Sequence, residues 1–327
     1  MNPKEIHNYM MSQHRNIYQE AQLFEQNRKI IDSYLENLVH PFHTNLTFKL
    51  DDDKLVAENS DTFSVKNNVI DFSTIKVDDT KLHDQWAELN DTLVNYQKFL
   101  TPYVLLNSLP IYSYIGEKTG LNQIKNAKVI DVGAGTGQIF GTFFFNQESI
   151  EYYLVDPNLR LLHDQFLRLY PKLAHFPLAH ILCYAENLPF KSGFADLVMS
   201  ISSIDHFKDY KKFMVEAHRV LKTGGSILIA SHLDSLTSKP AQIKVPKELT
   251  KDGSERSFTD KVYNRLVLKF EHYAKKYHNK KRGKIVDDHL HHFDDTKVLE
   301  NSLKENGFIV EQAEVFNRNF FIKAKKV

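Results

Sequence analysis

The residues with the clearest capacity for chemistry are three glycines at alternate positions, Gly133, Gly135 and Gly137. They follow the apolar run Val129–Val132, which predicts a buried parallel strand. Glycine lets the backbone turn tightly and approach a ligand without interference from a Cβ. Gln138 begins a predicted helix, whose free N–H groups and positive dipole end favour a carboxylate or a phosphate. The stretch therefore predicts a binding loop at the end of a strand.

Three interpretations of this loop compete. A dinucleotide fingerprint needs Gly-x-Gly-x-x-Gly, but the third glycine here comes one residue early, at Gly137. A glycine-rich turn without a ligand is the second interpretation. The form Asp131-x-Gly133-x-Gly135-x-Gly137 also resembles the first motif of class I S-adenosylmethionine-dependent methyltransferases. That resemblance implies S-adenosylmethionine as cofactor, bound by Asp131, Gly133, Ala134, Gly135, Gly137 and Gln138.

A second acid follows the next predicted strand, Glu151–Val155. At the carboxyl end of this strand, Asp156 is placed to accept hydrogen bonds from two ribose hydroxyls. Dinucleotide enzymes and methyltransferases both use an acid there, so Asp156 does not separate the two families. The resemblance places Pro157 beside it in the cofactor site.

The run Ala185-Glu186-Asn187-Leu188-Pro189-Phe190 follows a third predicted strand, 180–184. It resembles the Ala-Glu-x-Leu-Pro-Phe run of the subfamily that includes ubiquinone/menaquinone-biosynthesis methyltransferases. In that family an aspartate that binds the adenine amino group usually precedes the alanine, whereas this chain has Tyr184. Adenine recognition is therefore expected from the Ala185 backbone and apolar neighbours. Glu186 and Ser200, the latter at the end of the fourth strand, complete the predicted cofactor site.

Methyl transfer requires that nucleophile, methyl group and sulfur are aligned and that water is excluded. A hydroxyl acceptor also needs a general base, and histidine titrates near neutrality. The predicted catalytic residues are His206 and His232, because both follow core strands on the cofactor side. Asp205 or Asp288 is the candidate to orient one of them. The other candidate bases are His289, His291 and His292.

Two histidine groups could also bind a metal, but we predict no metal site. The segment around His40-Pro41-Phe42-His43 resembles the small zinc-ribbon-like domain of the tRNA-methyltransferase activator family, which normally has a Cys-Pro-x-Cys turn. Its second cysteine pair would fall near 56–60, where the chain has neither Cys nor His. Glu58 or Asp61 could join the two histidines, but a metal-free β-hairpin module is favoured over a tetrahedral site. The run Asp288-His289-x-His291-His292 is the other, less favoured metal candidate.

The elements that must position these residues alternate regularly between strand and helix from Lys128 onward. The chain ends in two predicted strands, 308–311 and 319–323, that form a closing hairpin. We therefore predict an α/β fold with a Rossmann-like, seven-stranded, mostly parallel sheet and a C-terminal antiparallel hairpin. Residues 1–77 are expected to form an N-terminal helix and small β module, and residues 78–327 the methyltransferase domain, with a helical insertion at about 233–287.

Composition narrows the function classes. The 327 residues contain 42 Lys and Arg against 41 Asp and Glu, which gives no overall attraction to nucleic acid or anionic membrane. The single cysteine, Cys183, excludes an intramolecular disulfide. No apolar run reaches the ~18 residues of a membrane span, and the polar start Met1–Glu5 lacks a signal core, so we expect a cytoplasmic protein.

These observations predict a methyltransferase that acts on a small molecule, at a hydroxyl of a sugar, lipid-linked glycan, quinone or similar metabolite. The Asp205-His206 pair and the late histidine run loosely resemble those of glycan-biosynthesis methyltransferases. An RNA or protein methyltransferase is the alternative, suggested by the activator-like module and by a basic run within 275–284. A non-catalytic S-adenosylmethionine-binding protein is the third class. The sequence does not fix the oligomeric state.

Overall fold

The computed structural model describes residues 34–66, 69–73, 111–112, 114–135, 149–157, 178–233, 290–316 and 318–327. Several predicted features lie outside these ranges: Gly137, Gln138, Asp288, His289, most of the N-terminal helical region, the boundary at 77/78, the basic run and the insertion at 233–287 apart from its first residue.

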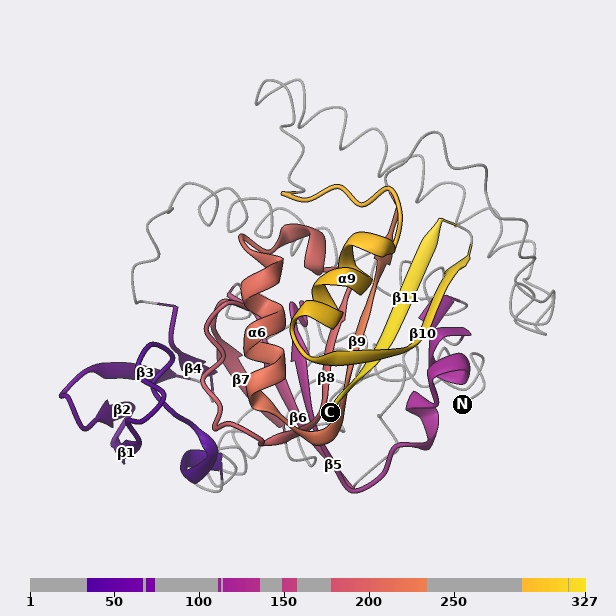
Figure 1. Ribbon diagram of the computed structural model, residues 1–327. Helices are drawn as coiled ribbons and strands as arrows, with labels where there is room; N and C mark the ends of the chain where they lie inside the picture. The colour runs from indigo at the N-terminus through magenta and orange to yellow at the C-terminus, as the bar shows by residue number, and fades with distance from the viewer. Residues whose placement is uncertain are drawn as a thin grey trace, which may run out of the picture.

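One mixed sheet organises the described residues (Figure 1). Five parallel strands form its centre, in the order β7 (Leu178–Leu182), β6 (Ile150–Val155), β5 (Ala127–Val132), β8 (Ala195–Ile201) and β9 (Leu221–His232). The antiparallel hairpin of β10 (Phe308–Phe316) and β11 (Asn319–Lys326) then pairs with β9 through β11. The central strands β5 and β6 are apolar and buried along nearly their whole length, as expected for strands covered on both faces. The predicted parallel centre and closing hairpin are confirmed.

The seven predicted strands are present as β5 to β11, but four further strands pair with them, so the sheet has eleven strands in the described residues. The extra four form an antiparallel meander, β1 (Phe48–Asp51), β2 (Lys54–Ala57), β3 (Thr62–Lys66) and β4 (Val69–Asp71). β4 pairs in parallel with β7, with Ile70 opposite Ile181. The N-terminal strands therefore extend the central sheet at the edge of β7.

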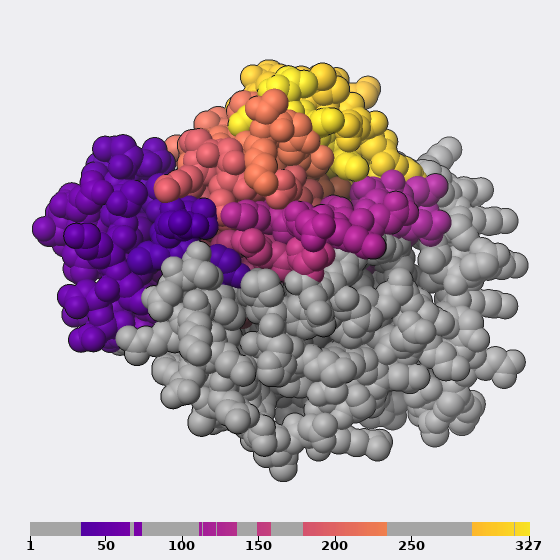
Figure 2. Space-filling view, turned by 90° about the horizontal axis from the view of Figure 1, so that it is seen from below, coloured from indigo at the N-terminus to yellow at the C-terminus, as the bar shows by residue number. Residues whose placement is uncertain are grey.

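The meander and the segment before it, which we call the N-terminal module (residues 34–73), also pack against the central fold. The Val39 amide donates to the Pro189 carbonyl at 3.1 Å, and the Tyr34 ring lies 4.8 Å from the Tyr153 ring. Buried side chains of the module belong to the same hydrophobic cluster as those of the α/β core. Figure 2 shows the module in indigo, as a lobe at one end of the molecule.

Two helices, α6 (Tyr210–Val220) and α9 (Lys297–Glu305), cover one face of the sheet (Figure 1). α6 begins at Asp209, whose carboxylate accepts from the amides of Lys211 and Lys212 as an N-cap. Short 3₁₀ turns occur at η1 (Leu35–Asn37), η2 (Leu121–Gln123) and η4 (Ile204–His206). None of the helices in the described ranges has the length and apolar character that crossing a bilayer requires.

Candidate functional site

The glycine loop leaves β5 and turns over the carboxyl end of β6. The amides of Gly133 and Ala134 both donate to the Val155 carbonyl, at 2.8 and 3.2 Å. Gly133 and Gly135 have φ angles of +75° and +52°, in the left-handed region where side chains are strained. A Cβ on Gly133 would lie 2.3 Å from the Ser203 Cβ, whereas among the described residues a Cβ on Gly135 would meet nothing within 4 Å. Gly133 is thus needed for packing, whereas none of the described residues packs against the position of a Cβ on Gly135.

Asp156 directly follows β6, as the sequence predicts, and it contacts the glycine loop. The Gly135 amide donates to Asp156 Oδ2 at 3.0 Å, which fixes the carboxylate beside the glycine backbone. Asp156 and Pro157 are half-buried at the carboxyl end of the strand. An acid held against a glycine backbone fits the ribose end of a nucleoside ligand.

Asp131 is the buried acid of the same loop, 1 % exposed. The Tyr152 hydroxyl donates to Asp131 Oδ2 at 2.7 Å from the neighbouring strand β6. Burial, together with the negative charge of Asp156 and opposed in part by this hydrogen bond, raises the pKa of Asp131 to about 7. Sequence reasoning placed Asp131 in the site but missed Tyr152, whose spacing carries no motif.

Ser200 and Ser203 connect β8 to the glycine loop. Their hydroxyl oxygens lie 2.9 Å apart, and the Ser203 hydroxyl donates to the Val132 carbonyl at 3.0 Å. Ser200 is fully buried, and its hydroxyl contacts the loop indirectly, through the Ser203 hydroxyl. Ser202 between them has a φ of +58°, a strained conformation for a residue with a Cβ.

The Asp205-His206 pair lies on η4, directly after β8. Asp205 is 2 % exposed, and its Oδ2 lies 3.9 Å from Nε2 of His206, whose side chain is 21 % exposed. The Ser231 hydroxyl, from β9, donates to Asp205 Oδ1 at 3.4 Å. A Cβ on Gly133 would also lie 3.5 Å from the Phe207 ring, so Ser203 and Phe207, which flank η4, both pack near the glycine loop.

The remaining predicted bases lie in different places. His232 is exposed at the carboxyl end of β9, beside the end of β8 in the sheet. His291 uses its ring to tie two segments together, because its Nε2 lies 2.8 Å from the Phe207 carbonyl oxygen. The amides of Leu290 and His291 also donate to the Asp205 carbonyl. His292 is exposed.

The run 185–190 is held by a clamp that sequence reasoning missed. Arg219 on α6 donates to the carbonyls of Phe190 and Leu188 at 2.6 and 2.7 Å, and it forms an ion pair with Glu216. Glu216 in turn accepts from the Leu188 amide at 2.8 Å. Glu186 accepts from the Asp209 amide, while Ala185 is buried in the apolar core. The clamp fixes the backbone at Leu188 and Phe190, in the same run as the Ala185 backbone that is predicted to recognise adenine.

His40 in the N-terminal module is a structural residue. It is 2 % exposed; its Nδ1 accepts from the amides of Phe42 and His43, and its Nε2 donates to Asp61 Oδ2 at 3.0 Å. Both ring nitrogens are therefore used in hydrogen bonds. Among the described residues, no group of three or more His, Cys, Asp or Glu side chains is arranged to hold a metal ion.

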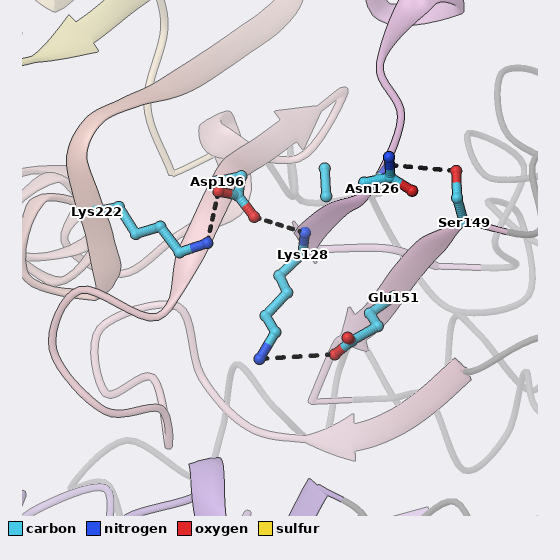
Figure 3. A pocket seen from close by; sticks show the side chains of 7 residues that line it. Asn126, Lys128, Ser149, Glu151, Asp196 and Lys222 are labelled. Carbon is cyan, nitrogen blue, oxygen red and sulfur yellow. Dashed lines mark hydrogen bonds and ion pairs between the residues drawn. The ribbon is translucent and has the colours of Figure 1, made fainter.

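A polar cleft lies near the amino ends of β5, β6 and β8 (Figure 3). The glycine loop lies at the other, carboxyl end of β5. The side chains of the cleft are paired with one another. Lys222 contacts Asp196 at 2.6 Å, and Lys128 lies 3.8 Å from Glu151. This cleft is distinct from the site built by the glycine loop.

A comparison with protein families matches residues 130–229 to a methyltransferase domain. This range runs from the middle of β5 through the acid of β6, the clamped run and η4 to β9. The chain contains an S-adenosylmethionine-dependent methyltransferase domain. The cofactor of this domain is S-adenosylmethionine, and the described part of the site fits it through the Gly135 backbone and the Asp156 carboxylate.

Two relatives show how far the similarity extends. The chain is 34 % identical over 112 residues to the chloroplastic 2-methyl-6-phytyl-1,4-hydroquinone methyltransferase of Spinacia oleracea, covering 33 % of this chain and 30 % of that protein. It is 31 % identical over 103 residues to the ubiquinone/menaquinone biosynthesis C-methyltransferase of Cupriavidus metallidurans, covering 31 % of this chain and 42 % of the relative. The match thus spans less than half the length of either relative.

A solved structure, the S-adenosylmethionine-dependent methyltransferase from Aquifex aeolicus, shares 13 % identity and a TM-score of 0.44. The alignment covers 67 % of this chain and 93 % of that chain. The sequence outside 130–229, including the N-terminal module, lies beyond the matched methyltransferase domain.

Proposed function

We propose that this chain transfers a methyl group from S-adenosylmethionine to a hydroxyl of a small-molecule acceptor, with His206 as the general base. The observation that carries the proposal is the packing of η4 on the glycine loop. A Cβ on Gly133 would lie 2.3 Å from the Ser203 Cβ and 3.5 Å from the Phe207 ring, and Asp205 and His206 come between these two residues in the chain.

Each residue of the site has its own role in the proposed reaction. S-adenosylmethionine supplies an electrophilic methyl group. Asp156 and the Gly135 backbone bind and orient the nucleoside, and Arg219 holds the run 185–190 against it. His206 takes the proton of the acceptor hydroxyl, and the buried Asp205 carboxylate, 3.9 Å from Nε2, stabilises the imidazolium that forms. His232, at the end of the adjacent strand, is the second candidate for the proton.

Hydroquinones are the acceptor class that we favour. One relative is named a hydroquinone methyltransferase and another a ubiquinone/menaquinone biosynthesis C-methyltransferase, whereas a third is named an ajmaline N-methyltransferase. A base that removes a phenolic proton increases electron density on the oxygen and on the adjacent ring carbon. The same His206 chemistry therefore supports methylation at either atom, and the product distinguishes the two.

The proposal is tested by following transfer of a labelled methyl group to a panel of hydroquinones, hydroxylated sugars and transfer RNA, with mass analysis of the products. We expect a hydroquinone or sugar product from the wild type and a loss of turnover of about 100-fold in the double variant His206→Ala, His232→Ala. Normal turnover of the double variant at neutral pH would refute the base assignment. Methylated RNA as the sole product would replace the acceptor class.

A further inference from the structure

We propose that cofactor binding is coupled to the release of a proton from Asp131, and that Tyr152 is a positioning residue that sets the pH at which this happens. The inference rests on the cofactor assignment and concerns how the same site is regulated. Two contacts carry it: Tyr152 donates to Asp131 Oδ2, and the Gly135 amide of the same loop donates to Asp156 Oδ2.

Asp131 has the environment of a carboxyl that changes protonation state. It is 1 % exposed at the end of β5, and the cost of burying an anion favours its neutral form. S-adenosylmethionine carries a sulfonium and an ammonium group. A cation bound at this loop favours the ionised carboxylate instead, since an opposite charge nearby offsets the burial cost. The Asp131 O–H bond then breaks, and the proton passes to solvent.

In the part of the chain that the structure describes, few titratable groups face Asp131. From β6 it is faced by Tyr152, which donates a hydrogen bond, and by Asp156, whose negative charge opposes ionisation. On the other side, its register partner on β8 is the uncharged Met199. Tyr114, which belongs to the same apolar cluster as Tyr152, donates its hydroxyl to Glu314. Tyr152 is thus the donor that favours the ionised form before the cofactor arrives.

Tyr152 and its neighbour Tyr153 provide a matched pair for a test. Both are fully buried on β6 but belong to hydrophobic clusters on opposite faces of the sheet. The Tyr153 hydroxyl donates to Glu151 at 3.1 Å and does not contact Asp131. Replacement of either tyrosine by phenylalanine removes one buried hydroxyl, but only Tyr152→Phe changes the environment of Asp131.

The experiment is calorimetric titration with S-adenosylhomocysteine and S-adenosylmethionine between pH 5.5 and 9, in two buffers of different ionisation enthalpy at each pH. We expect the wild type to release up to about one proton per cofactor on the acid side, and its affinity to fall about tenfold per pH unit there. Tyr152→Phe should bind about tenfold more weakly at pH 7 and equally well at pH 9. Tyr153→Phe should follow the wild type, and Asp131→Asn should release no proton.

The outcomes separate the inference from the cofactor assignment. A wild type that binds neither ligand at any pH overturns the cofactor assignment and the inference with it. Binding without proton release, or an affinity that Tyr152→Phe lowers equally at every pH, overturns the inference alone. Thermal unfolding of each variant confirms that the folded protein is being titrated.

Discussion

Ser203 donates its hydroxyl to the Val132 carbonyl at 3.0 Å, and its Cβ occupies the space that a side chain on Gly133 would need. This contact joins the end of β8 to the end of β5 and fixes where η4 begins. The catalytic proposal depends on that placement, because His206 lies three residues beyond Ser203.

Gly133→Ala should destabilise the protein by about 3 kcal/mol or more, since it adds a backbone strain at φ +75° to a 2.3 Å clash with the Ser203 Cβ. Ser203→Gly in the same chain removes the clash and should recover part of the loss. Gly193→Ala, at φ +67° in open surroundings, is the control and should cost about 1–2 kcal/mol. Denaturant unfolding measures all four proteins, and equal costs at Gly133 and Gly193 would contradict the packing role.

Arg219→Leu should weaken cofactor binding and lower the free energy of unfolding by about 3 kcal/mol. The change leaves Glu216, 15 % exposed, without its cation and frees two carbonyls of the run 185–190. The control is Lys222→Ala, which removes an exposed ion pair with Asp196 and should cost less than about 1 kcal/mol. Titration calorimetry and denaturant unfolding test both variants; unchanged affinity in Arg219→Leu would argue against a clamp.

Phe63→Ala should lower the unfolding temperature of the whole protein. Phe63 is 2 % exposed within a cluster that is continuous from the N-terminal module to the α/β core, and its truncation should cost about 3–5 kcal/mol. Phe42→Ala, at a side chain that is 43 % exposed, should have little effect. Calorimetry should show one cooperative transition for residues of both parts. A separate, selectively shifted low-temperature transition would mean that the module folds independently.

Acidification should destabilise the N-terminal module through His40. Burial lowers the pKa of His40, outweighing the contact with Asp61, so the folded state resists protonation while the unfolded chain accepts a proton. Stability from this residue is complete above a pH of about 6.5, the ordinary histidine pKa, and falls as the pH drops below it. Stability measured from pH 7.5 to 5 should decline less in His40→Gln than in the wild type. His218, whose pKa is also lowered by burial, contributes an effect in the same direction that His218→Gln isolates.

The strands were predictable because their residues carry local signals. The predicted strand 129–132 lies within β5 (Ala127–Val132). The β-like patterns at 46–50, 54–56, 62–65 and 69–72 match β1 to β4 to within two residues at each end. The parallel pairing of β4 with β7 was not predictable, since strand partners more than a hundred residues apart leave no pattern in either segment. The apolar run 226–231 predicts the last parallel strand, but β9 begins at Leu221, because an irregularity in its pairing with β8 accommodates the glycine turn at 224–225.

The residues of the site also differ in whether the sequence could predict them. The loop and Asp156 were predictable from the sequence, because the glycines and the acids directly follow predicted strands. Tyr152, Ser203 and Arg219 were missed, since each acts on residues 21 to 71 positions away and only the packed structure brings them together. From the sequence alone, a tyrosine within a buried strand is interpreted as a residue of the hydrophobic core.

The measurement that tests the central claim most directly is titration of the purified protein with S-adenosylmethionine and with NAD, for the wild type and Asp156→Ala. Asp156 is held by the Gly135 amide where the ribose hydroxyls are expected. We predict micromolar binding of S-adenosylmethionine that weakens at least tenfold in the variant, and no binding of NAD. Tight binding of NAD, or no binding of S-adenosylmethionine at millimolar concentration, would contradict the assignment of this site.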